Sequence, residues 1–144
     1  AFSVRHGQPI SLIMIDLDHF KRVNDEHGHP AGDAVLRSVA RVIQRAVRNE
    51  DIAARFGGEE LCVLARGTAA GGGLALAERL RRNIESLPVR AGTEVLRVTA
   101  SLGVATFEQA GDRDLVAAAD EALYVSKTNG RNRSTHASEL QHAE

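Results

Sequence analysis

The sequence predicts an α+β domain with a central, mostly antiparallel sheet of about five strands flanked by helices. Three observations lead to this prediction. A continuously apolar run at 11–17 is typical of a strand that is covered on both faces. Strand-like segments at 51–56 and 60–65 are separated by Gly57-Gly58. Long segments elsewhere repeat their apolar residues at helical spacing, and the overall order β-α-α-β-β-α-β-α predicts an antiparallel or mixed sheet with helices packed against it.

The elements of the first half follow from local patterns. Residues 11–17 (SLIMIDL) form the first strand, and a short helix is expected at 20–26 in the polar stretch behind it. Apolar residues on one stripe, with arginines opposite, predict a helix at 30–47. The next two strands form a hairpin with Gly57-Gly58 as a tight turn, because glycine tolerates a positive φ.

The second half has one more helix, a strand and a final helix. A helix is expected at 74–87, and strict alternation of apolar and polar residues over 96–104 predicts a half-buried strand. A third long helix covers 112–127, with Asp112 as its N-cap and an end near Gly130. An extra hairpin fits near 89–95. From 134 onward the residues are small and polar, so we expect a folded domain over 1–133 and a disordered tail over 134–144.

Length, charge and composition exclude several classes of protein. The 144 residues fit one compact domain, and a net charge of −1 argues against a nucleic-acid coat or a membrane-surface binder. No apolar run approaches the roughly 20 residues of a membrane helix. The single cysteine, Cys62, lies among apolar neighbours and is interpreted as a core residue rather than a nucleophile. We therefore expect no nucleic-acid or membrane contact by this domain.

Two acidic turns are candidates for a metal site. Asp16 and Asp18 close the first strand, and a buried carboxylate is costly without a partner such as Mg²⁺, which prefers oxygen ligands. Asp18 has an alternative role as the cap of the helix that follows. In RFGGEEL, Glu59 and Glu60 follow two glycines that leave room for a phosphate, although a solvated hairpin turn explains the pattern equally well. If the first strand lies beside the hairpin, these carboxylates converge, as two-metal phosphoryl-transfer sites require.

Several motifs in the right order resemble one known family. IDLDHFKRVNDEHGHPAGD, ARFGGEEL, VTASLGVAT and ADEALYVSKTNGRN make the chain from about Ile10 to Arg133 similar to the GGDEF family of diguanylate cyclases. That family's fold resembles the palm of nucleotide polymerases and class III nucleotide cyclases. Leu61 stands where the family most often has Phe. The family's upstream DxLT segment is missing, so we expect that the N-terminal part of the family domain is trimmed and that a regulatory domain lies upstream.

The resemblance implies roles for individual residues. It implies two Mg²⁺ ions (or Mn²⁺) bound by Asp16, Glu59 and the carbonyl of Leu17, with Glu60 as a second-metal ligand or as the base for a 3′-hydroxyl. The phosphates would contact the backbone N–H groups around His19, Phe20 and Lys21, where a helix begins, and the side chains of Lys127 and Arg131. An ordinary basic helix end is the alternative for this last pair. Guanine would be read by Asn24 and Asp33, and Asp33 is also a candidate N-cap of the long helix.

The implied reaction joins two GTP molecules into cyclic di-GMP. Each domain would bind one GTP, so turnover needs a homodimer, and the need for GTP implies a cytoplasmic location. Arg48 and Asp51 form an RxxD pattern where the family has a product-inhibition site, with Arg79 in support; a surface ion pair is the alternative. Rival functions are a receptor that only binds cyclic di-GMP, a GTP-binding regulatory module and a protein-interaction domain.

Overall fold

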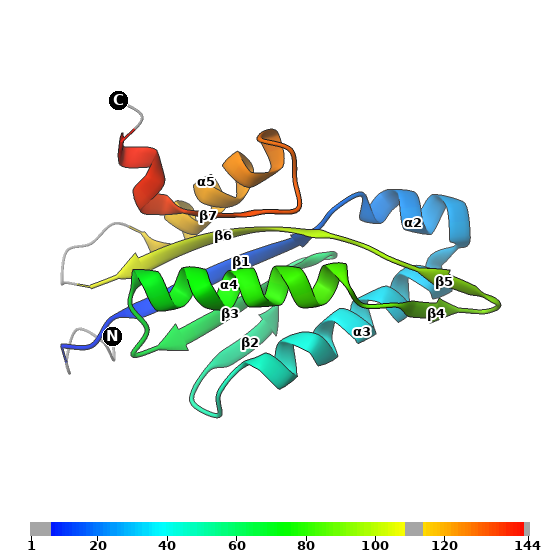
Figure 1. Cartoon of the computed structure of the whole chain (residues 1–144), viewed down its shortest axis with the longest axis horizontal. Helices are drawn as coiled ribbons and strands as arrows, with labels where there is room; N and C mark the ends of the chain where they lie inside the picture. Colours follow the sequence, from blue (N-terminus) through cyan, green and yellow to red (C-terminus); the bar gives the residue numbers. More distant parts are fainter. Residues whose placement is uncertain (1–6, 109–113, 143–144) are drawn as a thin grey trace.

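β1 (Ile10–Leu17) is the central strand of a five-stranded sheet with the order β2-β3-β1-β6-β7 (Figure 1). The computed structural model describes residues 7–108 and 114–142. The other strands are β2 (Ile52–Arg55), β3 (Glu60–Arg66), β6 (Ala100–Phe107) and β7 (Ser134–His136). Every neighbouring pair is antiparallel except β6 and β7, which are parallel. The predicted α+β class with a mostly antiparallel five-stranded sheet is confirmed.

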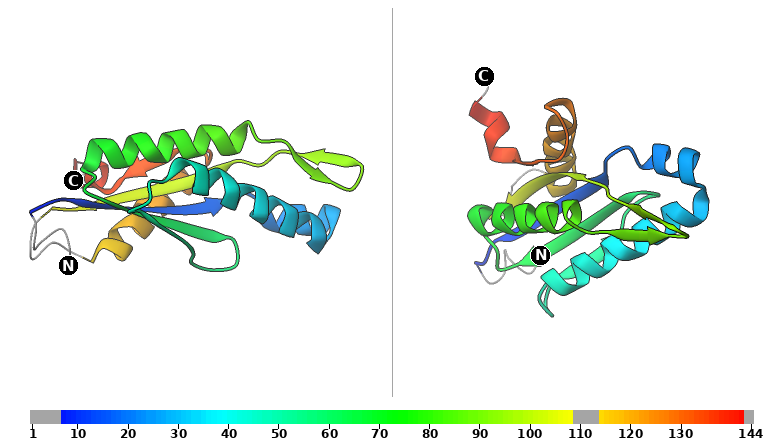
Figure 2. Two further views of the ribbon diagram at one scale, coloured as in Figure 1. Left: turned by 90° about the horizontal axis from the view of Figure 1, so that it is seen from below. Right: turned by 45° about the vertical axis from the view of Figure 1, so that its right-hand side comes forward.

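Helices cover both faces of this sheet. Alternate residues of β1 divide between two cores: Ile13 and Ile15 pack with α3 (His29–Ala46) and α4 (Ala70–Glu85), whereas Leu12 and Met14 pack with α5 (Leu115–Thr128). The left view of Figure 2 shows α4 and α5 on opposite sides of the sheet. No helix in the described part of the chain has both the length and the apolar character needed to cross a membrane.

Two further elements extend from the end of the sheet at which β1 stops. α2 (Phe20–His27) follows β1 almost directly and packs against α3. β4 (Val89–Ala91) and β5 (Glu94–Leu96) form a separate two-stranded hairpin, as expected near 89–95, and it projects beyond the sheet (Figure 1).

The strand predicted at 96–104 differs in position and burial. β6 begins at Ala100, and both of its faces are buried because α5 covers the side expected to face solvent. Gly103 explains how α5 approaches so closely, since a Cβ at this position would overlap the carbonyl of Ala119 and the backbone of Leu123. Ser101 and Gly103, the polar positions of the pattern that lie within β6, are therefore buried, whereas Arg97 remains exposed.

The predicted tail is wrong for residues 134–142. Ser134–His136 form β7 along the edge of β6, and a 3-10 helix, η1 (Ala137–His142), follows. Thr135 is buried and shares a 2.7 Å hydrogen bond with Ser126, while His136 shares one of 2.9 Å with Thr106. The polar side chains of Thr135 and His136 thus have partners on α5 and β6. Residues 143 and 144 lie outside the described residues.

Two local predictions about caps and turns are also corrected. Asp112 lies outside the described residues, and the N-cap of α5 is Asp114, which accepts hydrogen bonds from the N–H groups of Val116 and Ala117. The β2–β3 connection is longer than a two-residue turn, because β2 ends at Arg55 and β3 starts at Glu60. Neither Gly57 nor Gly58 has a positive φ.

Candidate functional site

β1 and β3 bring two of the predicted carboxylates together. The antiparallel register places Asp16 directly opposite Glu60. Residues in such a pair project from the same face with Cβ atoms about 5 Å apart. The shared face is the one that α5 covers, because Asp16 follows Leu12 and Met14 in the strand's alternation. The acidic cluster therefore lies at the end of the β1–β3 pair, beside α5.

Glu59 joins this cluster. The pKa of Glu59 is raised by burial and by the nearby charge of Asp16. Burial and Asp16 likewise raise the pKa of Glu60, with a further contribution from Asp120 on α5. Ionised carboxylates repel one another at this distance, and a divalent cation would remove the repulsion.

The surroundings of Asp16 fit a metal ligand. The residue is buried, at 6% exposure, and its Oδ2 atom forms an ion pair with Nζ of Lys127. Its Oδ1 atom is buried and has no hydrogen-bond partner among the described residues. An orphaned carboxylate oxygen of this kind is a ready donor for a hard cation.

The protein supplies few side-chain ligands for such a cation. Within residues 7–108 and 114–142, no group of three or more His, Cys, Asp or Glu side chains is arranged to hold a metal ion by itself. Mg²⁺ is commonly bound by one or two carboxylates together with waters and substrate phosphates. A site of Asp16, a glutamate and a backbone carbonyl therefore fits a metal that arrives with its nucleotide.

Asp18 has neither of the roles considered from the sequence. Its carboxylate is buried and accepts hydrogen bonds from Thr99 Oγ1 and Ser101 Oγ, both at 2.7 Å, and from the backbone N–H of Asn132 at 3.0 Å. The N-cap of α2 is His19, with φ of 56° and no side-chain capping bond. Asp18 thus ties the end of β1 to β6 and to the turn after α5.

The predicted phosphate-binding groups lie around this cluster. Phe20 and Lys21 open α2, and the first N–H groups of a helix have no acceptor within it. Lys127 contacts Asp16, so one member of the predicted basic pair lies in the cluster itself. Arg131 is exposed in the turn after α5, with φ of 63°, and its N–H donates to the carbonyl of Ser126.

The predicted guanine-reading residues lie where α2 meets α3. A Cβ at Gly32 would overlap the side chain of Asn24 and come within 3.1 Å of the ring of Phe20, so a glycine is needed for this close approach. Asp33 follows Gly32 and is exposed. It is not an N-cap, because α3 begins at His29 with Gly28 as its cap.

The three residues of the predicted inhibitory site line one pocket. Arg48, Asp51 and Arg79 border a hollow of about 490 Å³ between the end of α3 and α4. The N–H of Arg48 donates to Asp51 Oδ2 at 2.9 Å, and its guanidinium lies 3.3 Å from Oδ1. Arg79 donates to the carbonyl of Ala46. The ion pair between Arg48 and Asp51, given above as the alternative to a binding site, is therefore present, and it lies in the same pocket as Arg79.

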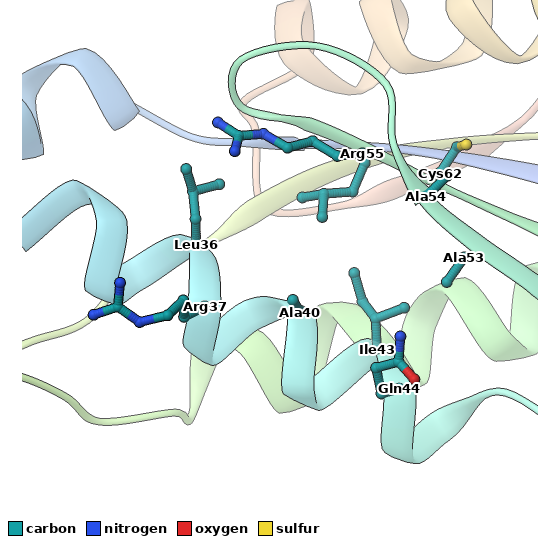
Figure 3. A pocket seen from close by; sticks show the side chains of 10 residues that line it. Leu36, Arg37, Ala40, Ile43, Gln44, Ala53, Ala54, Arg55 and Cys62 are labelled. Atoms are coloured by element: carbon teal, nitrogen blue, oxygen red, sulfur yellow. The ribbon is translucent and has the colours of Figure 1, made fainter.

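A second pocket, of about 260 Å³, lies between α3 and the β2–β3 hairpin (Figure 3). Leu36, Ile43 and Leu61 contribute to its largely apolar lining, and Arg55 stands at the hairpin side, where it donates to the carbonyls of Gly57 and Gly58. Cys62 also lines it and is half-buried rather than a full core residue. Burial raises the pKa of this thiol, so it stays protonated, consistent with a packing role.

The sequence reasoning missed the polar partners of Asp18. Thr99 and Ser101 were interpreted as the polar half of a half-buried strand, and Asn132 was given no role. A signal was present, since a carboxylate that closes an apolar strand needs donors and these residues are the donors of the neighbouring strand and turn. These donors could not be assigned to Asp18 because a single sequence does not specify that β1 pairs with β6.

Comparisons with known proteins agree with this arrangement. A sequence model of the family described as "Diguanylate cyclase, GGDEF domain" matches residues 2–133. Diguanylate cyclase A of Treponema denticola is 45% identical over 130 residues, and the response regulator PleD of Caulobacter vibrioides is 42% identical over 130 residues. The alignments cover 89% and 88% of this chain but only 35% and 29% of those proteins. The chain therefore corresponds to about a third of these relatives.

Solved structures give the same family. The GGDEF domain of DgcB from Caulobacter crescentus, in complex with c-di-GMP, superposes with a TM-score of 0.89 at 37% identity, covering 95% of this chain and 82% of that one. Diguanylate cyclase SiaD of Pseudomonas aeruginosa, in complex with its activator SiaC, gives a TM-score of 0.88 at 41% identity, with 94% and 52% covered.

Proposed function

Because the chain belongs to the GGDEF family of diguanylate cyclases, we propose that it binds GTP and condenses two GTP molecules into cyclic di-GMP. The observation that carries this proposal is the pairing of Asp16 with Glu60 across β1 and β3, with Glu59 near enough for the charge of Asp16 to raise its pKa. These three carboxylates come from two separate segments of the chain, and the ion pair between Lys127 and Asp16 sets one positive charge against them. Their convergence is explained by a divalent cation and a bound triphosphate.

A divalent cation, Mg²⁺ or Mn²⁺, would be held by Asp16, Glu59 and the carbonyl of Leu17. When bound, it would neutralise charge on the phosphates and lower the pKa of the attacking hydroxyl. Two such ions per site are part of the proposal, as the number of converging carboxylates suggests. The orphaned Oδ1 atom of Asp16 supports its role as a ligand.

The chain's own residues would bind and orient the nucleotide. The N–H groups at the start of α2 and the ammonium of Lys127 would hold phosphate oxygens, with Arg131 reaching them from the turn after α5. Gly58 has open space around it, so its backbone is free to approach a phosphate. Asn24 and Asp33 would read guanine, because a carboxylate accepts from N1–H and N2–H₂ and an amide both donates and accepts.

In each of two equivalent steps, the 3′-oxygen of one GTP would form a bond to the α-phosphorus of the other. The bond between that phosphorus and the bridging oxygen to the β-phosphate would break, and pyrophosphate would leave. Glu60 would accept the proton of the 3′-hydroxyl or bind the second cation, and both roles need its carboxylate. One chain holds one GTP, so two chains must face each other as a homodimer. A domain that consumes GTP is expected in the cytoplasm.

The pocket of Arg48, Asp51 and Arg79 would bind cyclic di-GMP and limit further synthesis. Arginine binds phosphate or the O6/N7 edge of guanine bidentately, and Asp51 can accept from the opposite edge. The volume of the pocket and the presence of both charges in it support this assignment.

Incubation with GTP and Mg²⁺, followed by chromatography of the nucleotides, tests the proposed function. The measurement should be made at several protein concentrations, because product formation should rise more steeply than linearly while dimers form. Cyclic di-GMP and pyrophosphate are the expected products. Binding of cyclic di-GMP without synthesis at any concentration would instead identify a receptor.

A further inference from the structure

The turn that follows α5 has an unusual backbone. Arg131 and Asn132 both have positive φ, at 63° and 48°, and neither is a glycine. Consecutive residues in the left-handed region are strained, and such a turn persists only when its surroundings hold it in place. The question is therefore what fixes it.

Asn132 is held on two sides. Its backbone N–H donates to Asp18 Oδ2 at 3.0 Å, which attaches the turn to the end of β1. Its side chain accepts a bond of 3.1 Å from Arg81 and donates one of 2.8 Å to Glu85, which attaches the turn to α4. All three of these partner atoms, on Asp18, Arg81 and Glu85, belong to residues outside the turn.

Both anchors are themselves well fixed. Asp18 is buried and is held by Thr99 and Ser101. The side chain of Arg81 is only 16% exposed and is held by two hydrogen bonds of 3.0 Å to Glu78, in addition to a contact with Glu85. A guanidinium fork bound in this way has little freedom, so it can act as a rigid support.

We propose that Asp18 and Arg81, acting through Asn132, are positioning residues that hold Arg131 at the phosphates of the bound nucleotide. Arg131 precedes Asn132 directly, and Lys127 stands one turn earlier at the end of α5, on Asp16. Fixing Asn132 therefore fixes the direction in which the chain leaves the acidic cluster, and with it the backbone position from which the Arg131 side chain extends. This inference rests on the proposed function, because it assumes that Arg131 contacts phosphate.

The test uses Arg81→Met and Asn132→Gly, with Arg82→Met as the matched control. Glycine accepts the positive φ of residue 132 and keeps the N–H that bonds to Asp18, so only the side-chain link to α4 is removed. Arg82 is exposed on the same helix, and its side chain makes no hydrogen bond or ion pair within the described residues, so Arg82→Met changes the charge equally. The probe is 3′-deoxy-GTP with Mg²⁺, which binds but lacks the attacking hydroxyl, measured by calorimetry well below each variant's melting temperature.

We expect Arg81→Met and Asn132→Gly each to weaken binding of 3′-deoxy-GTP about 10-fold, the effect of losing one charge-assisted hydrogen bond. The double variant should be no weaker than the weaker single variant, because both substitutions break the same link. Binding of guanosine, which has no phosphate, should be unchanged. A purely structural link would lower the melting temperature and leave the affinity for 3′-deoxy-GTP at the wild-type value, and that result would overturn the proposal. Failure of the wild-type protein to bind 3′-deoxy-GTP would refute the proposed function instead.

Discussion

The ammonium group of Lys127 on α5 forms an ion pair with the buried carboxylate of Asp16 at the end of β1. The charge of the same aspartate raises the pKa of Glu59, and Glu60 lies directly across from it on β3. Lys127 is thus the positive charge that offsets three carboxylates when no cation is bound. A divalent cation would also offset the charge of the carboxylates. The stability of the region around Asp16 should therefore depend on Lys127 and on the cation.

Replacing Lys127 with Met should destabilise the metal-free protein. Loss of one partner from a fully buried ion pair costs about 3–5 kcal/mol, but Lys127 is 34% exposed, so about 1–2 kcal/mol is expected. Mg²⁺ should restore most of the loss, because it neutralises Asp16 directly. Thermal unfolding with and without Mg²⁺ measures both effects. Lys21→Met is the control, since the side chain of Lys21 is 91% exposed and pairs only loosely with Asp25. A variant as stable as wild type without Mg²⁺ would contradict the role given to this ion pair.

Replacing Glu60 with Gln should abolish formation of cyclic di-GMP without unfolding the protein. The neutral amide is a much weaker ligand for a divalent cation than a carboxylate, and it cannot accept the hydroxyl proton. It also removes a carboxyl group whose pKa is raised by burial and by Asp16, so the melting temperature without Mg²⁺ should stay the same or rise. Chromatography of the nucleotides and thermal unfolding check the two halves of this prediction. Glu121→Gln, an exposed change on α5, should leave both values unchanged. Near-normal turnover in Glu60→Gln would refute the role of Glu60.

The sequence predicted the sheet and the acidic cluster well because both depend on local patterns. The apolar run of β1 and the acidic residues that close it are sufficient to place Asp16 at the end of a buried strand, and the condition that the hairpin lies beside this strand is met by the pairing of β1 with β3. The strand β7 was missed because its short, polar sequence carries no periodic signal, and only the free edge of β6 gives it a partner. The full burial of β6 was also missed, because it depends on a tertiary contact. Gly103 has no side chain, so α5 can pack directly on β6 at this position.

Replacing Arg48 with Ala should remove binding of cyclic di-GMP. Arg48 provides a guanidinium in the pocket and orders the neighbouring segment through bonds to the carbonyl of Arg66 and to Thr68. Hydrogen bonds to a charged group contribute about 1.5–3 kcal/mol, so the affinity should fall by a factor of roughly 10 to 100. Calorimetric titration of cyclic di-GMP measures the change, with the exposed Arg45→Ala on α3 as the control. Unchanged affinity in Arg48→Ala would remove this pocket from the proposal.

Replacing Gly103 with Ala should strongly destabilise the fold, although the substitution adds only one methyl group. The new Cβ would overlap backbone atoms of Ala119 and Leu123, which cannot rotate away as a side chain would. Overpacking costs about 1–3 kcal/mol, and a backbone contact places the expected loss at the upper end of that range. Denaturant unfolding measures it. Gly71→Ala on α4 is the control, since no atom lies within 4 Å of its Cβ position and the helix gains propensity. Equal stability of the two variants would mean that α5 does not approach β6 as closely as described.

His136 should make the protein less stable in mild acid. Its Nδ1 atom accepts the N–H of Ser138 at 3.0 Å and its Nε2 atom bonds to Thr106, so the neutral ring fits its site. Burial lowers the pKa of His136 below its usual value of about 6.5. The unfolded chain then takes up a proton below pH 6.5 while the folded chain does not, and stability falls with decreasing pH until the folded pKa is passed, by at most about 1.4 kcal/mol per pH unit. Glu59 and Glu60 have the opposite effect, because their pKa values are raised from about 4.5 and the folded chain takes up these protons before the unfolded chain does. Urea unfolding at pH 7.5 and pH 5.5 should show the loss in wild type and in the exposed variant His29→Gln. The loss should shrink in His136→Gln, and an equal loss in all three proteins would contradict the assignment to His136.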